Sequence, residues 1–248
     1  MRQLQAKALG APRDVLAVAD ADDPPLAPGE IRISCHAVGL PVTYQTAWFA
    51  LRRAGLAAGE TVLVHAGAGG VGVAVTQLAT AWGARVIATA GGERKLAVCR
   101  EQGAAEAIDY QKADFAREVA RLTGGHGADI VIDPVGGDVF ARSLDCLAFE
   151  GRIVPAGAAG GRPPLIDPMA LTGKNVSVVG LSWGSAYPFE RPAAVREAYQ
   201  ELIGMLGRQV RPLIDRVIGL AEVPAALTDL EERRTVGKVV VRPERGLS

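Results

Sequence analysis

The sequence predicts an α/β protein: a doubly wound parallel sheet with a reduced, mostly antiparallel β part built from the two ends of the chain. From Glu60 onward, short β-branched runs alternate with helical stretches, and these runs are apolar throughout. Strands of that kind are buried on both faces, as in a parallel sheet covered by helices. The flanks lack this alternation and contain turn-rich segments such as "DADDPPLAPGE".

Each expected strand and helix of the central region corresponds to one stretch of the sequence. We expect strands at residues 61–66, 84–90, 129–135, 151–157 and 175–181, and helices at 71–82, 93–103 and 114–124. The helices end at Gly83, Gly103 and Gly124, as helix-terminating glycines do. In the flanks we expect strands near 4–9, 30–38, 213–220 and 237–243, with a short helix over 222–234.

Composition narrows the classes of partner. Of the 248 residues 49% are hydrophobic and 5% aromatic, and 27 basic residues balance 27 acidic ones. A neutral chain without a basic run argues against nucleic acid or an anionic membrane as partner. Cys35, Cys99 and Cys146 form no CxxC pair, which favours free thiols over a disulfide framework or structural zinc. With no signal peptide and no spanning run, we expect a cytoplasmic protein.

A glycine-rich turn, "HAGAGGVG" at residues 65–72, lies between a predicted strand and a predicted helix. Gly67, Gly69 and Gly72 match the pattern G-x-G-x-x-G, and a second strand ends near Ala90. In this context the first glycine permits the tight turn, the second lets a pyrophosphate approach, and the third lets the helix pack on the strand. The pattern therefore predicts a Rossmann dinucleotide-binding domain.

The end of the second strand indicates which dinucleotide binds. NAD sites usually have an acidic residue there for the ribose 2′-hydroxyl. This chain reads "TAGGERK", with no acid before Glu93, and Arg94 and Lys95 follow at once. No carboxylate at the strand end repels a 2′-phosphate, and the two nearby cations attract one. The sequence therefore favours NADP(H), with Lys95 ahead of Arg94 as the residue that binds the phosphate. The alternative is that both cations are solvated residues of a helix's first turn.

Several motifs occur together in one order: "PVTYQTAWFAL", "AGETVLVHAGAGGVG", "GARVIATAGGERK", "AIDY", "DIVIDPVGGDVF", "GRIVPAG", "KNVSVVGLSWG" and "VGKVVV". Together they resemble the zinc-independent quinone oxidoreductases (zeta-crystallin-like) of the medium-chain dehydrogenase/reductase superfamily. The resemblance covers residues 1–39 and Pro41 to the end. It implies a remnant of a GroES-like domain at 1–40, a Rossmann NADP-binding domain at 41–210, and a C-terminal return to the β remnant at 211–248.

The resemblance also implies contacts to the cofactor. They run from the pyrophosphate and the 2′-phosphate side through the adenine ribose to the nicotinamide end, where the family usually has "VVG" in place of "VPAG", and finally to a segment that closes the cleft. The residues, in that order, are Gly67, Ala68, Gly69, Gly70, Val71 and Gly72; Gly91 and Lys95; Tyr110; Val135 and Gly136; Pro155, Ala156, Gly157, Ala158 and Thr46; and Leu181, Ser182 and Trp183. For Tyr110 and Trp183, core packing is the alternative role.

In the family, NADPH passes a hydride to a quinone or an activated alkene without a metal or a strong acid–base residue, and the protein orients the cofactor. We therefore expect no metal and assign no catalytic residue. Cys35 and His36 form one adjacent pair without a third ligand at suitable spacing. His65 and His126 have no evident catalytic partner, so we expect them to be structural or solvated.

The chain departs from the family at residues 39–41, where "EIRISCHAVGL" joins directly to "PVTYQTAW". Most of the GroES-like domain is missing at this join. The nicotinamide would then lie on an open shelf that admits water and orients substrate weakly, so cofactor binding survives better than turnover.

Three functions follow as alternatives: an NADPH-dependent quinone or enone reductase, a non-catalytic NADP(H)-binding protein or truncated variant, and a reductase module of the polyketide enoyl-reductase type. The family also pairs subunits through the last Rossmann strand, which implies a homodimer through Asn175–Leu181.

Overall fold

A computed structural model describes residues 2–6, 16–20 and 40–242, with side chains from residue 40 onward. The chain divides into two compact units: residues 40–212 form the larger, and residues 1–39 with 213–248 form the smaller. Cys35, His36 and the strand expected at 30–38 lie outside the described residues. None of the described helices is long and apolar enough to cross a membrane.

The larger unit is built on a six-stranded sheet in which every described pair is parallel. In sheet order the strands are β5 (Glu106–Asp109), β4 (Arg85–Ala90), β3 (Thr61–Val64), β6 (Ala128–Asp133), β7 (Leu147–Pro155) and β8 (Ser177–Val178). The chain winds outward from β3 to one edge and then from β6 to the other. This doubly wound order confirms the predicted Rossmann architecture, in which ligands bind at the carboxyl ends of the strands near the reversal.

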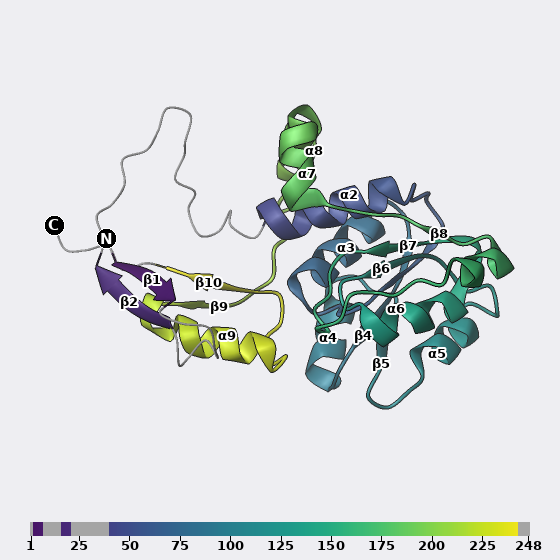
Figure 1. Cartoon of the computed structure of the whole chain (residues 1–248), viewed down its shortest axis with the longest axis horizontal. Coiled ribbons are helices and arrows are strands. Elements are labelled where there is room, and N and C mark those ends of the chain that lie inside the picture. The colour runs from purple at the N-terminus through teal and green to yellow at the C-terminus, as the bar shows by residue number, and fades with distance from the viewer. Residues whose placement is uncertain (1, 7–15, 21–39, 243–248) are drawn as a thin grey trace. The chain divides into compact units, whose positions relative to one another are not determined.

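Helices cover both faces of this sheet (Figure 1), with α2 and α3 on one side and α5 and α6 on the other. The helical segments of the unit are η2 (Leu40–Tyr44), α2 (Gln45–Arg53), α3 (Gly70–Ala81), α4 (Glu93–Glu101), α5 (Phe115–Leu122), α6 (Gly137–Ser143), η3 (Leu144–Cys146), η4 (Pro168–Lys174), α7 (Trp183–Glu190) and α8 (Pro192–Met205). The sequence predicted α3, α4 and α5 within a few residues of these bounds.

The core lies between the sheet and the helices. On the α5–α6 face, Leu63 and Val131 from the strands pack in one cluster with Phe115 and Phe140 from the helices. All four residues of β3 are buried, which explains why the last three, Val62, Leu63 and Val64, are aliphatic. Each fully buried side chain of this size stabilises the fold by roughly 1.5–3 kcal/mol.

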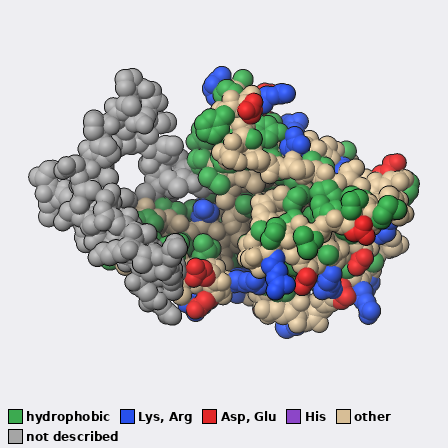
Figure 2. Space-filling model, viewed as in Figure 1, with side chains coloured by type: hydrophobic (Ala, Val, Ile, Leu, Met, Phe, Trp, Pro, Cys, Tyr) green, Lys and Arg blue, Asp and Glu red, His purple; other side chains and the backbone are tan. Residues whose placement is uncertain are grey.

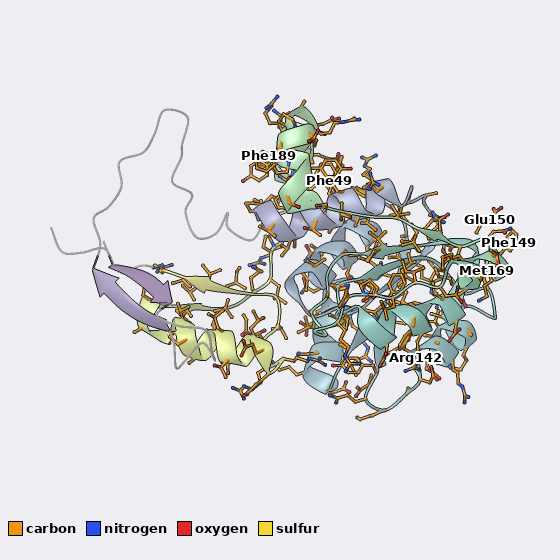
Figure 3. The ribbon with its side chains drawn as sticks, viewed as in Figure 1. Phe49, Arg142, Phe149, Glu150, Met169 and Phe189 are labelled. Carbon is orange, nitrogen blue, oxygen red and sulfur yellow. The ribbon has the colours of Figure 1, made fainter. Side chains whose placement is uncertain are left out.

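Helices α7 and α8 pack against α2 and against each other (Figure 1). The rings of Phe49 and Tyr187 lie 4.0 Å apart between centroids, and the guanidinium of Arg52 lies 3.4 Å from the carboxylate of Glu201. Phe189 points away from this contact and is 79% exposed (Figure 3).

The described residues of the smaller unit form two strand pairs. β1 (Arg2–Ala6) and β2 (Leu16–Asp20) pair antiparallel, which agrees with an antiparallel flank, although the sequence predicted no strand at 16–20. β9 (Ile214–Ile218) and β10 (Lys238–Val241) pair parallel, contrary to the expectation of a mostly antiparallel part. The physical reason is the connection: η5 (Leu220–Glu222) and α9 (Val223–Glu231) join the two strands, and a helical crossover returns the chain in the same direction.

Two further differences concern short strands. β5 has four residues, of which only Ile108 and Asp109 are buried, so its apolar run was too short to predict a strand. The strand expected over residues 175–181 is limited to Ser177–Val178. It begins after Asn175, which takes the left-handed conformation at the end of η4 and so cannot extend the strand.

Candidate dinucleotide-binding site

The glycine-rich turn connects β3 to α3 through residues 65–69. The N–H of Gly67 donates to the carbonyl of Thr89 on β4 at 2.9 Å, and the N–H of Gly69 donates to the carbonyl of Ala66 at 2.8 Å. Ala66 has a φ of 50°, which turns the chain sharply after the strand. The loop is therefore fixed to the neighbouring strand as well as to itself.

The three glycines of the motif differ in the space around them. A Cβ on Gly72 would lie 2.6 Å from the Cα of Gly67 and would collide with the carbonyl of Ala66. A Cβ on Gly67 would lie 2.7 Å from the Cβ of Ala88. At Gly69 the nearest atom would be 3.2 Å away, again the Ala66 oxygen. Gly67 and Gly72 are thus required by packing inside the fold, whereas Gly69 is not.

The N-terminus of α3 begins directly behind this loop. Gly69 is the N-cap, no side chain caps the helix, and no acidic residue lies in its first turn. The first N–H groups of a helix have no partner within it, and the helix dipole places partial positive charge there. An uncapped N-terminus behind a glycine turn is suited to an anionic group such as a pyrophosphate.

A second group of predicted residues meets at the ends of β4 and β5. A Cβ on Gly91 would lie 2.9 Å from the Tyr110 hydroxyl and 3.0 Å from the Gln111 amide nitrogen, so these side chains lie directly against Gly91. Lys95 lies in the first turn of α4, where its N–H donates to the carbonyl of Gly92. Tyr110 is 41% exposed, so it is not a core residue.

A third group meets at the ends of β6 and β7. The N–H of Ala156 donates to the carbonyl of Asp133 at 2.8 Å. A Cβ on Gly157 would lie 3.0 Å from the Pro134 oxygen, and one on Gly136 would lie 3.5 Å from the Cα of Ala158. The loops after these two strands therefore lie against each other and bring Gly136, Gly157 and Ala158 together.

The remaining predicted residues lie on α2 and at the start of α7. The indole N–H of Trp183 donates to the side-chain oxygen of Gln45 at 3.0 Å. Thr46 is the next residue along α2, and Leu181 and Ser182 directly precede Trp183. One hydrogen bond thus connects the segment predicted to close the cleft with the helix that carries Thr46.

His65 is a buried structural residue, as expected. Its Nδ1 lies 2.9 Å from the Thr89 hydroxyl and its Nε2 lies 2.8 Å from the Ser143 hydroxyl. Complete burial lowers the pKa of His65 to about 3, so the ring is neutral at physiological pH. His126 is exposed and lies 2.8 Å from the carboxylate of Asp129.

Sequence reasoning missed two carboxylates at the site, Asp109 at the end of β5 and Asp133 at the end of β6. Asp109 accepts from the N–H of Gln111 at 3.1 Å, and Asp133 accepts from the N–H of Val135 at 2.8 Å. Burial raises the pKa of the Asp133 carboxyl. The available signal was an aspartate at a strand end, because such residues bind the backbone N–H two positions later.

These residues fit a bound dinucleotide. The turn leaves space at Gly69, the α3 N-terminus supplies N–H groups for a pyrophosphate, and polar side chains surround Gly91. Among the described residues, no group of three or more histidine, cysteine, aspartate or glutamate side chains could hold a metal ion. The fold and this site define a Rossmann dinucleotide-binding domain.

Residues 70–204 match the family described as zinc-binding dehydrogenase. The chain is 40% identical over 208 residues to quinone oxidoreductase-like protein 2 of Bos taurus, covering 83% of this chain and 60% of that protein. It is 38% identical over 214 residues to the Nematostella vectensis homolog of that protein, covering 85% and 58%.

Solved structures agree with this match. The quinone oxidoreductase of Thermus thermophilus, also solved in complex with NADPH, superposes with a TM-score of 0.74 at 40% identity, covering 84% of this chain and 66% of that one. A mycobacterial protein solved in complex with NADPH superposes with a TM-score of 0.78 at 35% identity, covering 86% and 65%.

The chain therefore belongs to the zinc-binding dehydrogenase family of the medium-chain dehydrogenase/reductase superfamily, within its group of zinc-independent quinone oxidoreductases. This confirms the resemblance found in the sequence. The chain spans 58% to 60% of the length of these two curated relatives.

Proposed function

We propose that this protein is an NADPH-dependent oxidoreductase that transfers a hydride to a quinone or an activated alkene. The observation that carries the proposal is the turn at residues 65–72 with the uncapped N-terminus of α3 behind it. Quinone oxidoreductases among the relatives, and solved structures of such enzymes with NADPH, support both the cofactor and the reaction.

Each group of residues has one task in this proposal. The glycine turn and the first N–H groups of α3 hold the pyrophosphate. Gly91, Tyr110 and Lys95 hold the adenine ribose and its 2′-phosphate, where a cation and hydrogen-bond donors stabilise the dianion. When bound, NADPH supplies the hydride.

At the other end of the site, the loops that contain Val135, Gly136 and residues 155–158 support the nicotinamide and exclude water from one side. Thr46 and the segment Leu181–Trp183 border the same end. Holding the nicotinamide in one orientation lowers the barrier to hydride transfer, because the nicotinamide and the substrate are already aligned.

A non-catalytic NADP(H)-binding protein is the second candidate. The specific observations that favour it are the direct join at residues 39–41 and the partial coverage of the relatives, 58% and 60%. The domain shortened at that join would supply the substrate-side wall in the family. Without it, cofactor binding persists and turnover falls.

Titration of NADPH and NADH fluorescence tests the cofactor, and NADPH oxidation with a panel of quinones, 9,10-phenanthrenequinone included, tests the reaction. We expect NADPH to bind at least about tenfold more tightly than NADH, a difference of about 1.4 kcal/mol. Lys95→Ala should remove much of this preference, whereas Arg117→Ala on the exposed face of α5 should not. Binding without turnover decides for the second candidate, and equal affinities contradict the assignment of NADP(H).

We also propose that two copies pair through the edge of the sheet at β8. This strand is the last of the sheet, and exposed apolar side chains, among them Phe149 and Met169, lie at the same end of the unit (Figures 2 and 3). The N–H of Val179 donates to Ile153 on β7, so the N–H of Val178 faces outward from the sheet. We expect Val178→Pro to give a monomer in sedimentation and Val178→Thr to stay a dimer.

A further inference from the structure

One carboxylate at the adenosine end of the site bonds to two separate loops. Asp109 is the last residue of β5 and is only 9% exposed. Its Oδ1 accepts from the N–H of Gln111 at 3.1 Å and from the N–H of Gly92 at 3.4 Å. Gly92 belongs to the turn between β4 and α4, so this side chain fixes that turn relative to the end of β5.

The other oxygen of Asp109 is buried and makes no hydrogen bond within the described structure. The ammonium of Lys112 lies 3.7 Å from it, on a side chain that is 75% exposed. A buried acceptor without a hydrogen bond destabilises the fold, so stability alone does not explain this residue. A role in positioning the neighbouring groups explains the presence of Asp109.

The two loops joined by Asp109 present a pair of hydrogen-bond donors. The Tyr110 hydroxyl and the Gln111 amide nitrogen both lie against Gly91, 2.9 Å and 3.0 Å from the place that a Cβ would take. Both side chains belong to exposed residues, which lose rotamer freedom when they are held in one geometry. A fixed backbone beneath them lowers that cost, because fewer torsions remain to be ordered.

Asp109 cannot itself act as the acid of an NAD site. Such an acid accepts a hydrogen bond from the ribose 2′-hydroxyl and therefore needs an accessible oxygen. Here two backbone N–H groups occupy Oδ1, and Oδ2 is buried. The second carboxylate oxygen is buried, whereas the Tyr110 hydroxyl and the Gln111 amide nitrogen beside Gly91 can both donate hydrogen bonds.

We propose that Asp109 is a positioning residue that sets the dinucleotide preference, by holding the Tyr110 hydroxyl and the Gln111 amide beside Gly91 as a donor pair for the 2′-phosphate of NADP(H). This inference rests on the proposed function and deepens it. It adds Gln111 to the residues that contact the cofactor, and it explains why an aspartate at this edge of the sheet is compatible with a phosphate ligand.

The test is the ratio of the dissociation constants for NADH and NADPH, measured by fluorescence titration together with thermal unfolding. Asp109→Ala should weaken NADPH about tenfold and NADH less than about threefold, which lowers the ratio. Asp109→Asn keeps an oxygen for both N–H groups and should stay within about threefold of the wild type for each dinucleotide. Gln111→Ala should lower the ratio about fivefold without changing the unfolding temperature.

Asp145→Asn is the matched control, because it removes one acidic charge from an exposed residue of η3 and should leave the ratio unchanged. Equal weakening of both dinucleotides by Asp109→Ala, or an unchanged ratio in Gln111→Ala, overturns the inference while the proposed function stands. If Asp109→Ala does not fold, the ratio in Gln111→Ala decides. Wild-type protein that binds neither dinucleotide overturns the proposed function, and the inference with it.

Discussion

Gln77 holds Arg211 by both of that residue's backbone polar groups: its amide oxygen lies 2.8 Å from the N–H and its amide nitrogen 3.0 Å from the carbonyl. The same oxygen accepts from the Tyr44 hydroxyl at 2.7 Å, and the same nitrogen donates to Gln102 at 2.6 Å. One side chain on α3 therefore ties η2, the end of α4 and the last residues of the larger unit together.

Replacing Gln77 with leucine tests this network. The volume is similar, but the Tyr44 hydroxyl loses its acceptor and the Arg211 backbone loses both partners. We expect the free energy of unfolding to fall by about 1–3 kcal/mol, because the partly buried Tyr44 hydroxyl is left without its acceptor, whereas the exposed Arg211 backbone can bond to water instead. Urea unfolding measures this loss, and Gln209→Leu at an exposed position provides the control. Equal stability of the two variants would contradict the network's role.

Gly72→Ala should damage the fold itself. The added methyl group would meet backbone atoms of Ala66 and Gly67, which cannot move aside as a flexible side chain can. We expect a loss of about 1–3 kcal/mol or more in the free energy of unfolding. Gly204→Ala on α8 is the control, because its Cβ meets no atom within 4 Å and alanine favours a helix by up to about 1 kcal/mol. A thermal melt of both variants decides the comparison.

Gly69→Ala should weaken cofactor binding more than it weakens the fold. Its backbone is extended, with a φ of −81°, and its Cβ would meet only the Ala66 oxygen at 3.2 Å. Because that contact is tight, the backbone of Ala66 must shift slightly, and we expect a loss of at most about 1 kcal/mol, less than in Gly72→Ala. Binding of NADPH should fall at least about tenfold, because the methyl group occupies the space through which a pyrophosphate approaches. Wild-type affinity in this variant would argue against the proposed phosphate position.

Sequence reasoning succeeded where the information is local. β3, the glycine turn and α3 follow one another along the chain, and their periodicity, turn residues and glycine spacing are visible within a short run of consecutive letters. The doubly wound order followed because alternating strands and helices permit few arrangements. The grouping of Gly91 with Tyr110 also depends on this order, since parallel strands bring their carboxyl ends to one edge.

Other features depend on partners far apart in the chain. Asp109 bonds to Gly92, 17 residues away, and Gln77 bonds to Arg211, 134 residues away. Nothing in a single sequence pairs such residues. The parallel pairing of β9 with β10 was missed for a related reason. The direction of β10 depends on whether α9 crosses back over the pair, and the local sequence does not show where a helix packs.

The hydrogen bonds of His65 fix its protonation and make stability depend on pH. The Ser143 hydroxyl donates to the Val139 carbonyl at 2.7 Å, so the ring's Nε2–H donates to Ser143 and its Nδ1 accepts from Thr89. Burial lowers the pKa of His65 from the ordinary 6.5 to about 3 in the folded protein. Between these values the unfolded chain binds one more proton than the folded one.

The free energy of unfolding should therefore fall, as pH decreases below about 6.5, by about 1.4 kcal/mol per unit from this residue alone. His65→Gln removes the titrating ring and should cost about 1–3 kcal/mol at a pH of about 7.5 through lost hydrogen bonds. The difference in the free energy of unfolding between wild type and this variant should then shrink by about 2–3 kcal/mol by a pH of about 4.5. The reason is that only the wild type contains the His65 ring, whose protonation in the unfolded chain lowers stability at acidic pH. A constant difference for His65→Gln over this pH range would contradict a neutral buried ring.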